Sequence, residues 1–258
     1  MTDRPRRPPS FADACAAVLA EPSATHTAAT TLAPVIARTV AEEWGGRRAQ
    51  LVTARLPADV DRVLELGCGV GALLEPLGHR YDVVGVDDRR RQLRFAAARG
   101  GTVVRGNPTA PPVRPVFDAV CAVEEATARF SASEICVTAY RALRPGGIAV
   151  VAAPTEPTAV LESGVETYSG TRYLLERAVD VVGSRAVEID YRVTDRQTGA
   201  TAVVTERRSI ETTTADGLTE ALQSAGFEHV LVAGESDLPG VVVGRGVRPI
   251  ETDVPVDR

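Results

Sequence analysis

The sequence predicts an α/β fold in which a mainly parallel sheet has helices on both faces and carries a small antiparallel β insertion. Two observations support this prediction. Between Arg62 and Pro154, short apolar runs alternate with helical segments, as in consecutive right-handed βαβ units. Beyond Pro154, apolar residues alternate with polar ones on either side of a loop that contains Gly199, which is typical of an antiparallel hairpin with one solvated face.

Residues 1–58 are expected to form a tail and a helical cap that precede the main domain. The first ten residues are basic and contain three prolines, so we interpret them as a loose tail. Residues 11–21 and 28–56 have the composition and apolar spacing of helices. The cap is therefore predicted to be helical before the first strand begins.

The core of the fold is predicted over residues 59–160. Strands of a parallel sheet that is covered on both faces are nearly continuous apolar runs. Such runs occur at residues 63–66, 81–87, 101–104, 117–123 and 148–154. Helices are expected between them, and the helix before the last run is stopped by Pro145, Gly146 and Gly147, because proline and glycine end helices.

An antiparallel insertion lobe is expected over residues 161–212. Its hairpin is predicted from the alternating segments AVEIDYRVTD and TAVVTERRSIETT, which begin at Ala186 and Thr201. The helix and strand rhythm then resumes, so residues 213–246 are assigned to the core. Residues 247–258 are interpreted as a polar tail.

Composition and charge exclude several classes of protein. The formal net charge is −5, with 29 basic and 34 acidic residues, which disfavours a nucleic-acid-binding protein with a broad cationic face. All the basic residues are arginine, so no Schiff-base lysine, P-loop lysine or Tyr/Lys proton relay can form. The arginine run at 89–91, with Arg94, is interpreted as a solvated helix face.

The sequence carries no sign of a membrane segment or a metal site. No run approaches the roughly 18 apolar residues that a membrane span needs, and the basic first residues lead into no apolar segment of the secretory kind. A cytoplasmic protein without membrane association is expected. The four cysteines are scattered without metal-ligand spacing, so they are predicted to be reduced thiols and no metal is expected.

A glycine cluster joins the first predicted strand to the following helix. Gly67, Gly69 and Gly71 allow a tight turn and let a ligand approach the backbone without meeting a Cβ. The second strand ends at Asp87, whose carboxylate can accept hydrogen bonds from two ribose hydroxyls. Together these features indicate a ligand that contains a nucleoside.

The same segment leaves other interpretations open. Gly67, Gly69 and Ala72 also satisfy the dinucleotide fingerprint, with Asp87 at about the ~20-residue spacing expected for that motif. The glycines can also serve only as a tight turn. Glu65 before the first glycine and the segment LRPGG from Leu143 favour S-adenosylmethionine over a nicotinamide.

The segments VLELGCGVG, VVGVDD, VVRGNP, FDAVCAV and LRPGG follow one another in order between residues 63 and 147. In these motifs the chain resembles the class I S-adenosylmethionine-dependent methyltransferases, over residues 60–154 and less closely over 213–246. The resemblance implies a Rossmann-like seven-stranded mixed sheet whose last strand inserts antiparallel. It also implies that S-adenosylmethionine lies across the carboxyl ends of the strands.

The resemblance assigns roles to particular positions of this chain. Glu65, Gly67, Gly69 and Gly71 would contact the methionine end of the cofactor, and Asp87 the ribose. The resemblance further implies an adenine edge at Asn107 and Pro108 and a wall beside the methyl group at Cys121 and Ala122. The family's usual acidic residue after Gly106 is Asn107 here, and an amide can still donate to adenine and accept from it.

Methyl transfer from a sulfonium is an in-line displacement, so the protein mainly has to position the reactants and exclude water. Glu124 and Glu125 follow the fourth strand, where a carboxylate could hold an ammonium acceptor or take its proton. A pair of solvated loop residues is an equally good interpretation. The insertion resembles the small lobe of relatives that methylate amino-sugars or other small molecules, although exposed strands also serve to pair two copies as a homodimer.

Three hypotheses about function follow. The first is S-adenosylmethionine-dependent methyl transfer to a small-molecule acceptor. The second is an NAD-dependent oxidoreductase, against which Glu65 and the LRPGG segment count. The third is a non-catalytic cofactor-binding protein that keeps the fold.

Overall fold

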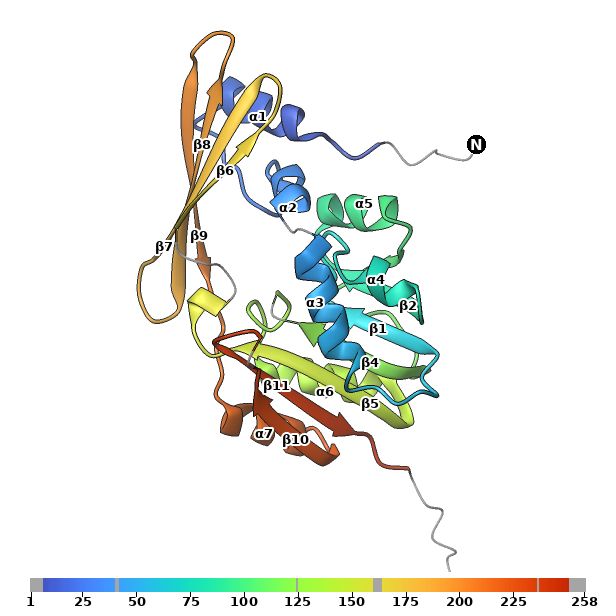
Figure 1. Ribbon diagram of the computed structural model, residues 1–258. Helices are drawn as coiled ribbons and strands as arrows, with labels where there is room; N and C mark the ends of the chain where they lie inside the picture. The colour runs from blue at the N-terminus through green and yellow to red at the C-terminus, as the bar shows by residue number, and fades with distance from the viewer. Residues whose placement is uncertain (1–6, 40–41, 124, 160–163, 236, 251–258) are drawn as a thin grey trace, which may run out of the picture.

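The computed structural model describes residues 7–39, 42–123, 125–159, 164–235 and 237–250. Figure 1 shows two parts, a helix-covered sheet and a separate antiparallel lobe, with the N-terminal helices lying along both. The first part contains a seven-stranded sheet and the second a four-stranded sheet. This arrangement confirms the predicted fold class.

The large sheet has the strand order β10-β11-β5-β4-β1-β2-β3. Strands β1 to β5 are parallel, whereas β11 is antiparallel to both β5 and β10. The strands are β1 (Arg62–Leu66), β2 (Asp82–Asp87), β3 (Thr102–Arg105), β4 (Phe117–Val123), β5 (Leu143–Pro154), β10 (Glu228–Gly234) and β11 (Val241–Val247). From β1 the chain adds β2 and β3 on one side of the sheet, and then β4 and β5 on the other side. Open α/β sheets bind ligands at such a switch point in strand order, here between β1 and β4.

Helices cover both faces of this sheet because its central strands are apolar on both sides. In β1, Val63 joins the core formed with α3, α4 and α5, whereas Leu64 and Leu66 join the core formed with α6 and α7. These helices are α3 (Glu42–Thr53), α4 (Leu74–Gly78), α5 (Arg90–Ala98), α6 (Ala132–Ala142) and α7 (Ala215–Ser224). A capping box between Ser131 and Glu134 starts α6.

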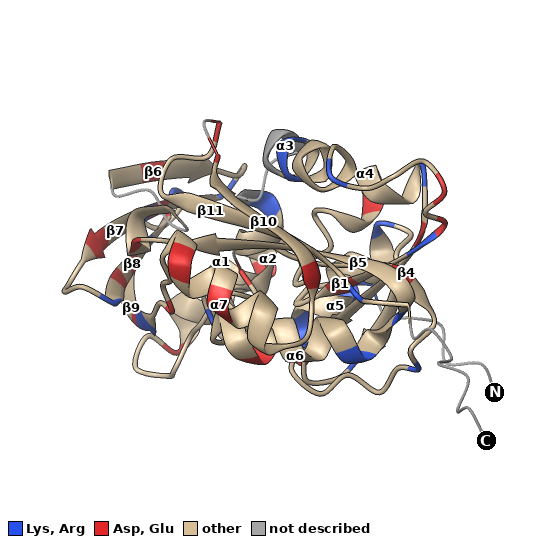
Figure 2. Cartoon of the chain, turned by 90° about the horizontal axis from the view of Figure 1, so that it is seen from below, with Lys and Arg blue, Asp and Glu red and all other residues tan. Residues whose placement is uncertain are grey.

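The lobe is larger than the hairpin predicted from the sequence. Two further strands, β6 (Gly164–Ser169) and β7 (Tyr173–Val181), precede the expected pair, β8 (Ala186–Asp195) and β9 (Thr201–Ser209). All four pair antiparallel in chain order. Figure 2 shows acidic and basic residues interspersed along these strands, so the pattern of β6 and β7 is less distinctly apolar than that of the core strands.

The N-terminal helices hold the lobe against the sheet. Helix α1 (Phe11–Ala20) and helix α2 (Ala33–Thr39) share an apolar core with the inner face of the lobe. Helix α2 also contacts α5 of the large domain, and it lies between the two parts in Figure 1. Within the described part of the chain, every helix is too short or too polar to cross a membrane.

Candidate functional site

The glycine loop follows β1 at the switch point of the sheet. Gly67, Gly69 and Gly71 have φ values of 75°, 52° and 79°, a left-handed conformation that favours glycine. A Cβ on Gly67 would lie 2.7 Å from the Cβ of Ala126, and on Gly71 2.7 Å from the Cα of Ala96. Beside Gly69 the nearest atoms are instead the ends of the Gln92 and Arg89 side chains, at 3.2 and 3.3 Å, and such side-chain ends can move aside more readily than backbone.

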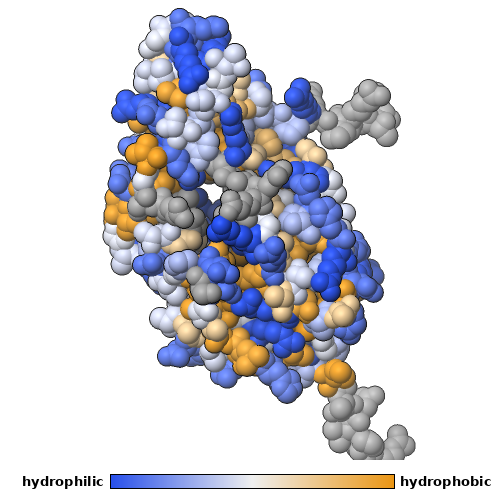
Figure 3. All heavy atoms as spheres, viewed as in Figure 1, coloured by the Kyte–Doolittle hydropathy of each residue, from blue (hydrophilic) through white to orange (hydrophobic). Residues whose placement is uncertain are grey.

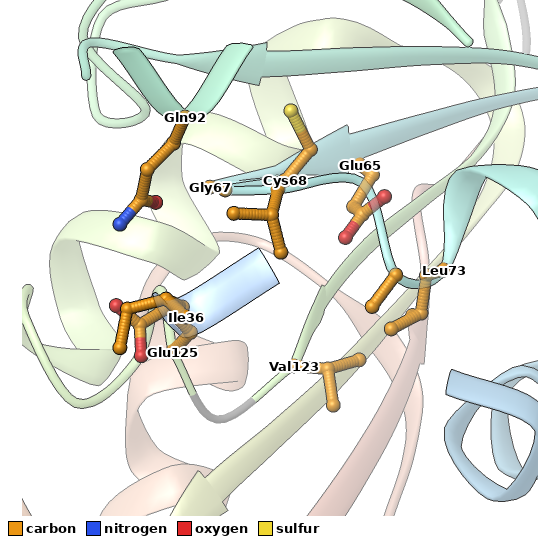
Figure 4. Close-up of a pocket in the computed structure, with 11 residues that line it drawn as sticks. Ile36, Glu65, Gly67, Cys68, Leu73, Gln92, Val123 and Glu125 are labelled. Atoms are coloured by element: carbon orange, nitrogen blue, oxygen red, sulfur yellow. The ribbon is translucent and has the colours of Figure 1, made fainter. Parts of the chain in front are cut away.

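A pocket adjoins the loop at the carboxyl ends of β1 and β4. It is lined by Ile36, Glu65, Gly67, Cys68, Gly69, Val70, Ala72, Leu73, Gln92, Val123 and Glu125. Figure 4 shows the apolar side chains of Ile36, Leu73 and Val123 around it, with two carboxylates and an amide as its polar groups. A mainly apolar cavity with a few converging polar groups is typical of small-molecule sites.

Glu65 is a polar residue of the pocket with an unsatisfied hydrogen-bonding group. Its side chain belongs to a buried residue of β1 that lines the pocket, and its Oε2 has no hydrogen-bond partner within the described residues. Burial, and then the charge of Asp87, raise the pKa of Glu65 to about 8. An unpaired buried carboxylate is costly, and an ammonium group in the pocket would satisfy it. Glu65 therefore fits the amino group of a methionine moiety.

Asp87 is the last residue of β2 and is fully buried. Its Oδ2 accepts from the backbone N–H of Gly69 at 3.0 Å and from Nη2 of Arg89 at 2.8 Å. Its Oδ1 accepts from the backbone N–H of Arg89 at 2.8 Å and from Nε at 2.9 Å. Burial alone would raise the pKa of Asp87, but the hydrogen bonds and charge of Arg89 hold it below its usual range.

An ionic chain runs from Asp87 to the lobe. Arg89 donates from Nη1 to Oε1 of Glu125 at 2.6 Å, and Glu125 also accepts from Nη2 of Arg208 on β9 at 3.2 Å. Against the effect of burial, Arg208 and Arg89 lower the pKa of Glu125 to about 2. Glu125 is thus ionised at neutral pH and a weak proton acceptor.

The N-terminal cap adds the outer wall of the pocket. Ile36 of α2 lines it directly. The backbone N–H of Ala28 donates to Oε2 of Glu206 in the lobe at 2.8 Å, and its carbonyl accepts from Nε2 of Gln92 on α5 at 3.0 Å. One peptide segment therefore ties the lobe to the helix that borders the pocket.

The other predicted residues lie around the same sheet edge. Asn107 follows β3, is exposed, and accepts at Oδ1 from the backbone N–H of Thr109 at 3.0 Å; Pro108 beside it is buried. Cys121 and Ala122 are packed in the two apolar cores, one on each side of the sheet. Glu124 lies outside the described residues. The cofactor contacts of these residues stay predictions.

Several pocket residues were missed by the sequence analysis. Val123, at the end of β4, lines the pocket in place of Cys121 and Ala122. The interpretation of the arginine run as a solvated face was wrong for Arg89, whose side chain is only 9% exposed. Its spacing of two residues from Asp87 was the signal available, since an arginine so close to a buried carboxylate can fold back onto it.

Comparison with known proteins agrees with this geometry. Residues 63–147 match the family model described as a methyltransferase domain. By this match, the segment is a methyltransferase domain. The match covers β1 to the start of β5, which includes the glycine loop and Asp87. A comparison of the sequence with curated proteins gives no match.

Solved structures share the fold over most of this chain. CalS10, an amino pentose methyltransferase from Micromonospora echinaspora, is 22% identical with a TM-score of 0.64, covering 84% of this chain and 95% of its own. DesVI from Streptomyces venezuelae is 19% identical, with a TM-score of 0.63 and coverage of 79% and 90%. The sugar N-methyltransferase KedS8 from Streptoalloteichus is 20% identical, with a TM-score of 0.62 and coverage of 81% and 86%. At these identities the likeness concerns the fold.

Proposed function

We propose that this chain transfers a methyl group from S-adenosylmethionine to an amine nitrogen of a small, sugar-like molecule. The observation that carries the proposal is the buried carboxyl group of Glu65, which has an oxygen without a hydrogen-bond partner among the described residues and lies in the pocket beside the glycine loop. The methyltransferase family match covers that segment. A cationic amino acid moiety is the ligand that such a site would stabilise.

Different residues would hold different parts of the cofactor. Glu65 would accept from the amino group, Gly69 would let the ligand approach the backbone, and Asp87 would accept from the ribose hydroxyls. When bound, S-adenosylmethionine supplies a methyl group that is electrophilic because it is attached to a sulfonium. Asn107 and Pro108 are proposed to meet the adenine, and Cys121 and Ala122 to support the wall that Val123 completes.

The acceptor is proposed to bind between the lobe and the core. Figure 3 shows a hollow between these two parts of the surface. Glu125 and Arg208 meet across this boundary, so charged groups are available there to orient a polar molecule. Neighbours with this fold include an amino pentose methyltransferase and a sugar N-methyltransferase, which supports an amine as the acceptor.

The protein's part in the reaction is positioning and exclusion of water. Ile36 of α2 and Val123 at the end of β4 give the pocket apolar walls, and such walls help to exclude water. The catalytic role predicted for Glu124 and Glu125 is retained in the proposal as orientation of the acceptor. For Glu125, two arginine partners favour this role over proton transfer.

Calorimetric titration tests the cofactor first. We expect S-adenosylhomocysteine to bind with a measurable heat and NAD to give none. The reverse result would favour the oxidoreductase hypothesis. Incubation with S-adenosylmethionine and a panel of amino sugars, followed by mass spectrometry, should then show addition of one methyl group. Cofactor binding without transfer to any of a broad panel of amines, alcohols and thiols would favour a non-catalytic protein.

The proposal also includes the setting of the protein. We place it in the cytoplasm with small-molecule partners, without nucleic acid or membrane partners, and with two copies pairing through the lobe. Light scattering after size-exclusion chromatography measures the mass of the assembly. A monomer at all concentrations would contradict the pairing and leave the catalytic proposal unaffected.

A further inference from the structure

Arg89 lies where the proposed function needs open access to Asp87. An ionised carboxylate offers about four acceptor positions. Those of Asp87 already accept from the backbone N–H of Gly69, the backbone N–H of Arg89, and Nε and Nη2 of the Arg89 guanidinium. Two ribose hydroxyls can donate to this carboxylate only after the guanidinium has withdrawn.

The Arg89 side chain also lies over the glycine loop. Its Nη2 is 3.3 Å from the position that a Cβ on Gly69 would take. The space that the glycine leaves clear for a ligand is therefore bordered by the guanidinium in this structure. Arg89 therefore lies beside the glycine loop as well as against the carboxylate of Asp87.

The guanidinium has a second anionic partner on the side away from Asp87. Its Nη1 donates to Glu125 at 2.6 Å, while Nε and Nη2 serve Asp87. Arg89 can therefore release Asp87 and remain paired with Glu125. Arg208 of the lobe holds the same carboxylate at 3.2 Å, so Glu125 stays in place when the first pair opens.

We propose that Arg89 is a displaceable substitute for the ribose of the cofactor. In the free protein its two side-chain donors occupy the oxygens of Asp87 in place of the ribose diol, which keeps a fully buried carboxylate paired. Binding of the nucleoside exchanges one pair of donors for another, and the guanidinium stays with Glu125. The inference rests on the proposed function, because it takes Asp87 as the ribose acceptor.

If the proposal holds, replacing Arg89 lowers the stability of the ligand-free protein and raises its affinity for the cofactor product S-adenosylhomocysteine. Arg89→Ala leaves Asp87 buried with fewer donors, so the ligand-free protein should unfold at a lower temperature, by roughly 4 °C or more. The same change removes the competitor of the ribose. S-adenosylhomocysteine should therefore bind more tightly, by roughly fivefold or more, the lower end of typical coupling between two sites.

The experiment compares wild type, Arg89→Ala and Arg90→Ala by thermal unfolding without ligand and by calorimetric titration with S-adenosylhomocysteine. Arg90 is the exposed neighbour at the start of α5, so its replacement should change neither quantity. Arg89→Lys keeps a cation but lacks the planar fork. It should fall between wild type and Arg89→Ala, and it provides a folded variant if alanine is not tolerated.

The outcomes separate this inference from the proposed function. If wild type binds and both Arg89 variants bind equally or more weakly while losing stability, Arg89 is a structural residue and the inference is overturned. If only the Arg89 variants bind, the inference is supported in its strongest form. If none of the proteins binds S-adenosylhomocysteine, the proposed function fails and the inference falls with it.

Discussion

The carboxyl group of Glu65 should make cofactor binding release a proton. Burial raises its pKa from an ordinary 4.5 to about 8 in the free protein, so at pH 7 the group is mostly protonated. An ammonium beside it favours the ionised form and lowers this pKa. Binding at pH 7 should then release up to about one proton per site.

The same shift sets a stability cost. The folded protein binds this proton more tightly than the unfolded chain, so stability falls as the pH rises from about 4.5 towards about 8 and levels off above that. At about 1.36 kcal/mol per pKa unit, the full difference is on the order of 5 kcal/mol and the part expressed at pH 7 about 3 kcal/mol. Glu65→Gln should therefore stabilise the free protein at pH 7 while weakening its affinity for S-adenosylhomocysteine.

Two measurements check this prediction. Calorimetric titration in buffers with different ionisation enthalpies gives the number of protons released, which should vanish in Glu65→Gln. Urea unfolding between pH 4.5 and 9 gives the stability of both proteins. Glu75→Gln, an exposed glutamate at the start of α4, is the matched control and should behave as wild type. Buffer-independent binding heats in wild type, or a Glu65→Gln protein no more stable than wild type at pH 7, would refute the reasoning.

Three further predictions concern the loop and the ionic chain. Gly69→Val should abolish S-adenosylhomocysteine binding in a titration, whereas Gly199→Val, which imposes a similar strain at φ 75° in a lobe turn with open space around it, should not. Glu125→Gln should slow methyl transfer without removing a limb of the pH–rate profile near neutrality, because the pKa of Glu125 is about 2; loss of a limb there would identify Glu125 as a base. Arg208→Ala removes the contact between the lobe and Glu125. It should lower the free energy of unfolding in urea by roughly 1 to 3 kcal/mol and raise the KM for the acceptor. An unchanged KM would show that this contact does not contribute to acceptor binding.

The sequence alone determined the features that depend on local chemistry. Strands such as β1 are apolar on both faces, and the turn after it needs glycine at Gly67, Gly69 and Gly71 because the backbone there is left-handed. These requirements act on residues that are near one another in the chain. For this reason the strands β1 to β5, the glycine loop, and the positions of Glu65 and Asp87 beside it could be predicted before the fold was known.

Only the tertiary structure decided how distant charges are shared. From the sequence, Arg89 is predicted to be one of a run of exposed arginines. In the structure it is buried beside Asp87 and Glu125, where ion pairs with both carboxylates replace contact with water. Arg208 reaches Glu125 from 83 residues away, and Ala28 joins Glu206 to Gln92 across an even longer stretch of chain. Such contacts depend on which surfaces the packed cores bring together. The residue pattern of a single segment does not determine which distant segment will lie beside it.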